Sequence, residues 1–137
     1  MNTWLMKTEP LSWSWDDQKK KGVEHWDGVR NWRAAGNMKL MKLGDLVFFY
    51  HTGKEKQIVG IVKIVKEYYP DHTDETGKFG MVDVKTVKGF KHPVTLAEVK
   101  ADPRFAELAL VRQSRLSVQP VDAKSWKALC AMGGVKP

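Results

Sequence analysis

The sequence predicts an α+β domain built on a small, twisted or closed β-barrel with short α-helices at its flanks. Three observations lead to this fold class. Several segments are dense in β-branched and aromatic residues, short helical stretches interrupt them without a regular βαβ order, and apolar residues occupy both parities of the longest strand. A chain of 137 residues without a Pro/Gly/Ser-rich linker suits one modest core, so we expect a single domain over residues 1–137.

The chain is predicted to begin with a short strand and a short helix. The strand covers residues 3–8, and Pro10 ends it because proline cannot donate to a β-ladder. In the segment SWSWDDQKKKG, Ser14 is a suitable N-cap, acidic residues follow near the positive helix end, and Gly22 is a suitable terminator. One or two helical turns are therefore expected after the first strand.

The next segments predict a loop, a second helix and a long hairpin. Residues 24–31, EHWDGVRN, are expected to form a loop, and NWRAAGNMKLMKLG contains enough helix formers for a short helix that Gly44 ends. Residues 45–51 and 57–69 flank the turn-like TGKEK and predict an antiparallel hairpin. The apolar residues on both parities of the second strand indicate that it is covered on both faces or coiled strongly into a barrel.

A loop over residues 70–80 and a further strand over residues 81–87 are expected next. Gly89 is a candidate for a β-bulge where the alternation changes phase. Thr95 and Glu98 have the spacing of a capping box, which predicts the start of another helix.

The C-terminal segment predicts one more strand and one more helix. The strand covers residues 114–121, and Asp122 is the N-cap of a helix that Gly133 ends. Cys130 shares a helix face with Trp126, which favours a core position over a nucleophile. Because Cys130 is the single cysteine of the chain, no internal disulfide is expected.

The charge balance points to polyanionic partners. The formal net charge is +7 and the isoelectric point is near 9.5, which is typical of proteins that bind nucleic acid or an anionic surface. The run from Lys19 to Lys21 is by itself more typical of a solvated surface. No apolar stretch approaches the roughly 20 residues that cross a bilayer, and the N-terminus lacks a secretory pattern, so we expect a cytoplasmic protein without a membrane partner.

The sequence contains no recognisable metal-binding, catalytic or phosphate-binding motif. The four histidines, His25, His51, His72 and His92, are scattered without metal-ligand spacing, so we expect no metal and no cofactor. There is no nucleophile elbow, no Cys/His signature and no glycine-rich phosphate loop. The sequence therefore predicts a protein that is not an enzyme.

Binding through aromatic side chains is better supported. The chain has six tryptophans, and Trp13, Trp26 and Trp32 lie in or beside predicted loops, where indole faces can hold a flat base. In WDGVRN, Gly28 permits an unusual φ, and Arg30 can meet a phosphate or lock the loop through Asp27. The alternative stays open that Trp26 plugs the end of the barrel and that Asp27 and Gly28 form an ordinary turn.

A set of motifs in fixed order resembles the EVE domain family. These motifs are WLMKTEP, WDGVRN, LGDLVFFYH, GIVKIVKEYYPD, MVDVK and SRLSVQP, and together they cover essentially the whole chain. The resemblance implies a PUA-like fold, a small mixed or antiparallel β-barrel with flanking helices. It also implies a non-catalytic module that captures a flipped, modified base of DNA or RNA, with methylated or hydroxymethylated cytosine as the expected ligand in DNA and modified nucleotides in RNA as the open alternative.

The resemblance also implies a set of base-pocket residues. The expected roles are stacking for Trp26, reading of the base edge by Asn31 and one serine, and phosphate or electrostatic contacts from Lys7 and Arg30. Lys7 and Glu9 are expected to face one pocket and to pair in the empty state. The full set is Trp4, Lys7, Glu9, Trp26, Val29, Arg30, Asn31, Tyr50, His51, Ser114, Leu116 and Ser117.

Two other classes of function remain open from the sequence. One is an enzyme or enzyme subunit that acts on modified nucleic acid or nucleosides, because such enzymes also build base pockets. The other is a module that binds a small molecule or a protein. For the favoured class, nucleic-acid binding, we expect a monomer.

Overall fold

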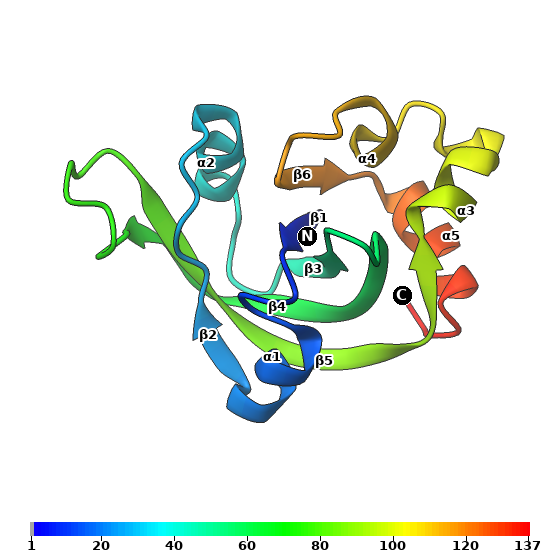
Figure 1. Ribbon diagram of the computed structural model, residues 1–137, viewed down its shortest axis with the longest axis horizontal. Coiled ribbons are helices and arrows are strands. Elements are labelled where there is room, and N and C mark those ends of the chain that lie inside the picture. The colour runs from blue at the N-terminus through cyan, green and yellow to red at the C-terminus, as the bar shows by residue number, and fades with distance from the viewer. Residues whose placement is uncertain (1) are drawn as a thin grey trace.

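A computed structural model describes residues 2–137 of the chain. Six strands form one mixed sheet in the order β2-β5-β4-β3-β1-β6 (Figure 1). β1 and β3 pair in parallel, and the other neighbouring strands pair antiparallel. The predicted α+β class is confirmed. The elements are β1 (Thr3–Thr8), α1 (Trp15–Lys21), β2 (Val23–His25), α2 (Trp32–Lys39), β3 (Leu46–His51), β4 (Gln57–Pro70), β5 (Gly80–Thr95), α3 (Leu96–Ala101), a 3-10 turn η1 (Pro103–Phe105), α4 (Ala109–Arg112), β6 (Val118–Val121) and α5 (Ala123–Met132).

The expected closed barrel is wrong, because the sheet keeps two open edges. The edges are β2, with three residues, and β6, with four. Helix α2 contacts both β5 and β6 and lies between the two ends of the sheet (Figure 1). The Asn37 side chain donates a hydrogen bond of 2.7 Å to the Val118 carbonyl of the edge strand. A helix therefore covers the gap that strand pairing would close in a barrel.

The sheet has a core on each face. The N-terminal core, covered by α1 and α2, consists of Trp4, Met6, Trp15, Trp26, Val29, Ala34, Met38, Met41, Val47, Phe49, Val59, Val62, Ile64, Val82, Val84, Leu116 and Val118. The C-terminal core, covered by α3, α4 and α5, consists of Leu5, Phe48, Tyr50, Ile58, Ile61, Val94, Val99, Phe105, Leu108, Leu110, Val121, Trp126, Leu129 and Cys130. Apolar residues of both parities in β4 are thus explained by burial on both faces.

Two facing glycines mark the place where the strands lose their regular register. Gly60 of β4 pairs with Gly89 of β5, and register shifts flank this pair, as predicted for Gly89. The Trp15 indole lies against them, since a Cβ on Gly60 would come within 2.4 Å of the ring. Glycine is required at position 60 because any side chain there would overlap the indole.

Caps explain most of the helix boundaries. Ser14 with Asp17 and Thr95 with Glu98 both form capping boxes, the second as predicted. Helix α2 ends at Lys39, earlier than expected, and Gly44 occupies a turn with φ +86 beyond the helix.

Three short elements differ from the sequence prediction. Strand β2 overlaps the first two residues of the expected loop, α4 is not predicted, and residues 114–117 precede the last strand instead of forming part of it. Each is three or four residues long, too short for a periodic pattern to show in the sequence. Among residues 2–137, no helix has the length and apolarity that a membrane crossing requires.

Candidate binding cleft

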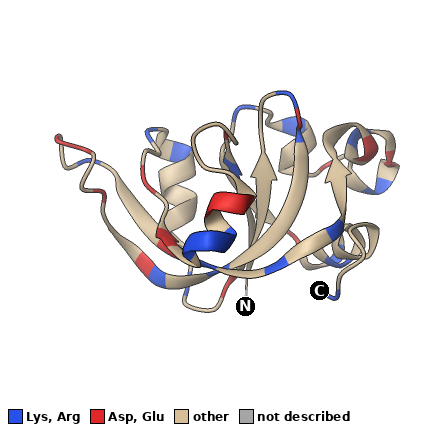
Figure 2. Cartoon of the chain, turned by 60° about the horizontal axis from the view of Figure 1, so that its bottom comes forward, with Lys and Arg blue, Asp and Glu red and all other residues tan. Residues whose placement is uncertain are grey.

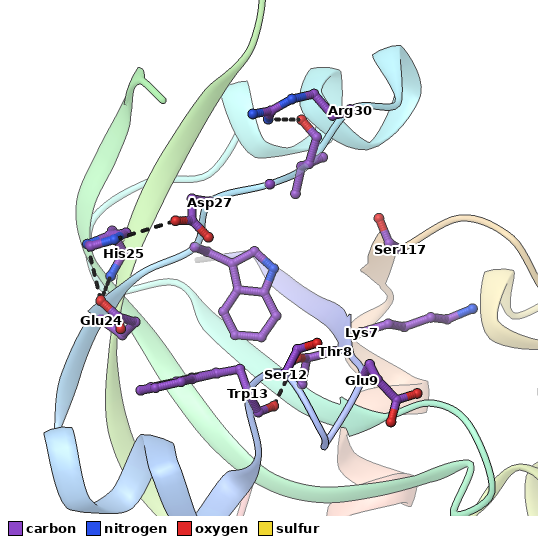
Figure 3. Close-up of a pocket in the computed structure, with 13 residues that line it drawn as sticks. Lys7, Thr8, Glu9, Ser12, Trp13, Glu24, His25, Asp27, Arg30 and Ser117 are labelled. Atoms are coloured by element: carbon purple, nitrogen blue, oxygen red, sulfur yellow. Dashed lines mark hydrogen bonds and ion pairs between the residues drawn. The ribbon is translucent and has the colours of Figure 1, made fainter. Parts of the chain in front are cut away.

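A cleft opens where the C-terminal end of β1 faces β2 and the loop that follows it (Figure 3). Its volume is about 440 Å³, within the ~300–1,000 Å³ common for small-molecule sites. Strand β1 and its following turn form one wall, β2 and its loop form the other, and the segment before β6 adds Ser117. The lining residues are Lys7, Thr8, Glu9, Ser12, Trp13, Glu24, His25, Trp26, Asp27, Gly28, Val29, Arg30 and Ser117.

Two tryptophans on opposite walls are held in place by the protein itself. Trp26 is 8% exposed, its backbone N–H donates to the Val82 carbonyl at 2.7 Å, and its ring packs edge-on against Phe49 at 5.5 Å. Trp13 is half-buried, and its indole N–H donates to the Gln18 side chain at 2.9 Å. Both rings are therefore ordered before any ligand arrives, which lowers the entropic cost of binding.

A buried carboxylate locks the loop after β2. Asp71, whose side chain is fully buried, accepts hydrogen bonds from the Gly28 N–H at 2.8 Å and from Arg30 at 2.9 Å. Burial by itself would raise the pKa of Asp71, but hydrogen bonds from Thr73, Gly28 and Arg30 outweigh it and hold this pKa well below its usual range. The expected partner of Arg30, Asp27, is thus replaced by Asp71, and the unusual φ expected at Gly28 is confirmed at +79.

Lys7 of β1 and Glu9, just after this strand, do not form the expected pair. Lys7 donates to the Ser114 carbonyl at 2.8 Å, and Glu9 accepts from the Leu11 N–H at 3.3 Å. Burial lowers the pKa of Lys7, since a cation is poorly solvated there. An ammonium group has three donors, so two remain for a ligand, although the Lys7 side chain extends away from Trp13 and Asp27 (Figure 3).

The structure places three of the expected pocket residues in the protein interior instead of the cleft. Trp4 is buried, and its indole N–H donates to Asp45 at 3.0 Å. Tyr50 belongs to the C-terminal core, where burial raises its pKa to about 12. The buried imidazole of His51 accepts a hydrogen bond of 2.9 Å from the Trp15 N–H and so holds the first turn of α1.

Three further expected residues line a neighbouring depression. Asn31, Ser114 and Leu116 border a hollow of about 340 Å³ together with Arg33 and Arg115. The Asn31 side chain accepts from the Ala34 N–H at 2.9 Å and is the N-cap of α2. Six of the twelve expected residues therefore line the cleft, and they are Lys7, Glu9, Trp26, Val29, Arg30 and Ser117.

Several cleft residues could not be assigned from the sequence. Glu24 and His25 enter because β2 pairs with β5, and they lie opposite the turn after β1, which contributes Ser12. Trp13 had a signal, as a tryptophan outside the predicted strands. Trp32 shared that signal but is 62% exposed and packs on Phe79, away from the cleft.

An α+β domain whose open mixed sheet carries a cleft with two fixed indoles is a binding domain of the PUA-like architecture that the motifs imply. The chain belongs to the EVE domain family, whose sequence model matches residues 2–132. The resemblance stated from the motifs is thereby confirmed.

Individual relatives agree with this assignment. Thymocyte nuclear protein 1 of Homo sapiens is 34% identical to this chain, over 98% of this chain and 75% of the relative. The NMR structure of Rpa0253 from Rhodopseudomonas palustris is 54% identical, with a TM-score of 0.92 over 98% of this chain and 94% of that chain. The crystal structure of human THYN1 in complex with 5-methylcytosine containing DNA is 33% identical, with a TM-score of 0.92 over 100% of both chains.

Proposed function

We propose that this protein is a non-catalytic nucleic-acid reader that takes one modified base, turned out of its stack, into the cleft between Trp13 and Trp26. The preferred ligand in this proposal is 5-methylcytosine or 5-hydroxymethylcytosine in DNA. The observation that carries it is the pair of indoles on two walls of one cleft, of which Trp13 is held by its indole hydrogen bond and Trp26 by its backbone hydrogen bond and its packing on Phe49. The family relative with bound 5-methylcytosine DNA supports the same ligand class.

The roles proposed for the two tryptophans follow from how much of each side chain is exposed. Trp13 offers more free surface than Trp26, so Trp13 is the stacking partner and Trp26 forms the opposite wall, backed by Phe49. A cytosine presents an exocyclic amino group, which carboxylates accept well. Asp27 and Glu9 line the cleft with such groups, and they replace Asn31 as the proposed readers of the base edge because the Asn31 side chain caps α2.

Backbone phosphates are proposed to lie along the neighbouring depression. Arg33 and Arg115 are exposed there, and Lys7 connects the two hollows through its bond to Ser114. The lysine run of α1 has a different role. It occupies the last helical turn, at the other end of the helix from the acidic first turn (Figure 2). Both sets of charges interact favourably with the helix dipole and so stabilise the helix.

The test is an anisotropy titration with labelled oligonucleotides that differ only in one 5-methylcytosine. We expect a clear preference for the modified oligonucleotide and only a shallow loss of affinity with salt, because base contacts carry the preference. Trp13→Ala is expected to weaken binding by about 1–3 kcal/mol, roughly 5- to 150-fold. The matched control is Trp32→Ala, which removes an exposed indole outside the cleft and is expected to change affinity little.

Equal affinity for both oligonucleotides, or equal losses in the two tryptophan variants, would contradict a reader of this kind. Mass spectrometry of the oligonucleotide after incubation distinguishes a reader from an enzyme that acts on the modified base. An altered or released base would indicate an enzyme, whereas recovery of the intact oligonucleotide is expected for a reader.

A further inference from the structure

Three side chains that are distant in the sequence converge at the outer rim of the cleft. His25 and Asp27 come from β2 and its following loop, and His72 comes from the loop between β4 and β5. One imidazole nitrogen of each histidine and one carboxylate oxygen of Asp27 lie within 4.8 Å of one another. The two imidazole rings approach edge-to-face with centroids 4.9 Å apart.

The ring of His25 is already oriented for such a role. The Glu24 carboxylate, only 15% exposed, lies 3.1 Å from His25 Nδ1, and Lys21 holds the same carboxylate at 3.0 Å. A carboxylate at Nδ1 favours the tautomer with its proton there, which leaves the Nε2 lone pair free. That nitrogen faces Asp27 at 3.6 Å (Figure 3).

The distances suit a transition-metal ion. Metal–nitrogen and metal–oxygen bonds of about 2.0–2.1 Å place tetrahedral ligand atoms about 3.4 Å apart. The His25 and Asp27 atoms are close to that separation, and His72 is exposed, so its ring can approach by rotation about its side-chain bonds. Two imidazoles and a carboxylate are a ligand set that suits zinc and its neighbours in the first transition row.

We propose that His25, Asp27 and His72 bind one divalent transition-metal ion, with Zn²⁺ as the reference ion and Glu24 as the positioning residue. Water completes the coordination. The ion joins the loop after β2 to the β4–β5 loop, beside the lock that Asp71 already forms with Gly28 and Arg30. Because Trp26 stands between two of the ligands in the chain, the bound ion also stiffens one wall of the cleft.

Isothermal titration of Zn²⁺ into the chelator-treated, tag-free full chain tests this proposal. One ion per chain is expected. His72→Ala is expected to weaken binding at least tenfold, and Glu24→Gln about 10- to 100-fold through loss of the carboxylate charge beside His25 Nδ1. The matched control is His92→Ala, which removes an exposed histidine outside the cluster and is expected to leave the affinity within twofold.

Thermal unfolding supplies a second measurement. Zn²⁺ is expected to raise the thermal unfolding midpoint of the unmodified chain and to raise the midpoint of His72→Ala much less. The reason is that a ligand stabilises the folded protein only by binding to the folded state. No one-to-one binding, or equal weakening by His72→Ala and His92→Ala, would overturn the proposal. His72 does not line the cleft, so His72→Ala is expected to bind modified DNA normally in metal-free buffer, and the metal and base proposals can fail separately.

Discussion

The two cores of this protein share strands but end differently at the surface. Neighbouring residues of β3 point to opposite faces, with Phe49 in the N-terminal core and Phe48 in the C-terminal core. On the C-terminal side Trp126 of α5 stacks flat on Phe48, with ring centroids 3.7 Å apart and planes 15° apart. On the N-terminal side Trp26 meets Phe49 edge-on from a loop, and a cleft remains beside it. At Phe48 a helix covers the sheet completely through apolar packing, whereas at Phe49 the loop that carries Trp26 covers the sheet only in part.

The loop after β2 is held in place by polar contacts, whereas apolar packing holds the helix on the other face of the sheet. Asp71 receives hydrogen bonds from Gly28, Arg30 and Thr73, and together they fix the segment that carries Trp26. Such contacts hold a loop in one conformation without filling the space beside it. The cleft therefore exists where polar locking replaces apolar packing.

The largest effect is expected from breaking the sealed core. Trp126→Ala is expected to lower the free energy of unfolding by about 3–5 kcal/mol, because a large buried side chain leaves a cavity. The protein that remains folded is expected to bind modified DNA with unchanged affinity, since Trp126 is remote from the cleft lining. Urea unfolding and anisotropy titration measure the two effects. A loss of affinity as large as that of Trp13→Ala would show that DNA binding at the cleft depends on the packing of the C-terminal core.

A smaller effect is expected from breaking the polar lock. Asp71→Asn removes a charged acceptor and is expected to cost about 1–3 kcal/mol of stability at neutral pH. The pKa of Asp71 is lowered by folding, so its contribution is complete above the unfolded value of about 3.9 and is lost as pH falls toward the folded value. Acid unfolding followed by tryptophan fluorescence is expected to show a weaker pH dependence in Asp71→Asn.

The comparison carboxylate for this experiment is Asp16, whose side chain is 83% exposed in its pair with Lys19. Asp16→Asn is expected to leave the acid transition nearly unchanged, because exposed pairs contribute little. An equal shift in both variants would indicate a general effect of charge and not a lock on the loop.

The smallest effect concerns the proposed phosphate contacts beside the cleft. Arg33→Gln and Arg115→Gln are each expected to weaken DNA binding modestly and to reduce the salt slope by about 1, without changing the preference for the modified base. Arg104→Gln, at an exposed arginine on the C-terminal side that pairs with Asp102, is the control and is expected to leave the slope unchanged. An equal salt dependence of DNA affinity in all three variants would show that the DNA backbone does not lie along the depression beside the cleft.

Local patterns predicted much of this structure because their causes are local. The strands, the capping box at Thr95 and Glu98, and the irregularity at Gly89 all depend on residues close together in the chain. The N-cap role of Asn31 is also local, because its side chain accepts from a backbone N–H three residues ahead, but the motif resemblance assigned this residue to the pocket. The position of His51 could not be predicted, because its imidazole accepts from the Trp15 N–H, 36 residues away in the sequence.

By itself the sequence determined the strand and helix alternation, the excess of positive charge and the family, since periodicity, composition and motif order are properties of the chain. Only the tertiary structure decided that α2 covers the gap between the sheet edges, that Asp71 is the partner of Arg30, and that His25 meets His72. These outcomes depend on contacts between segments more than 40 residues apart, and no local pattern encodes which of many possible partners the folded chain brings together.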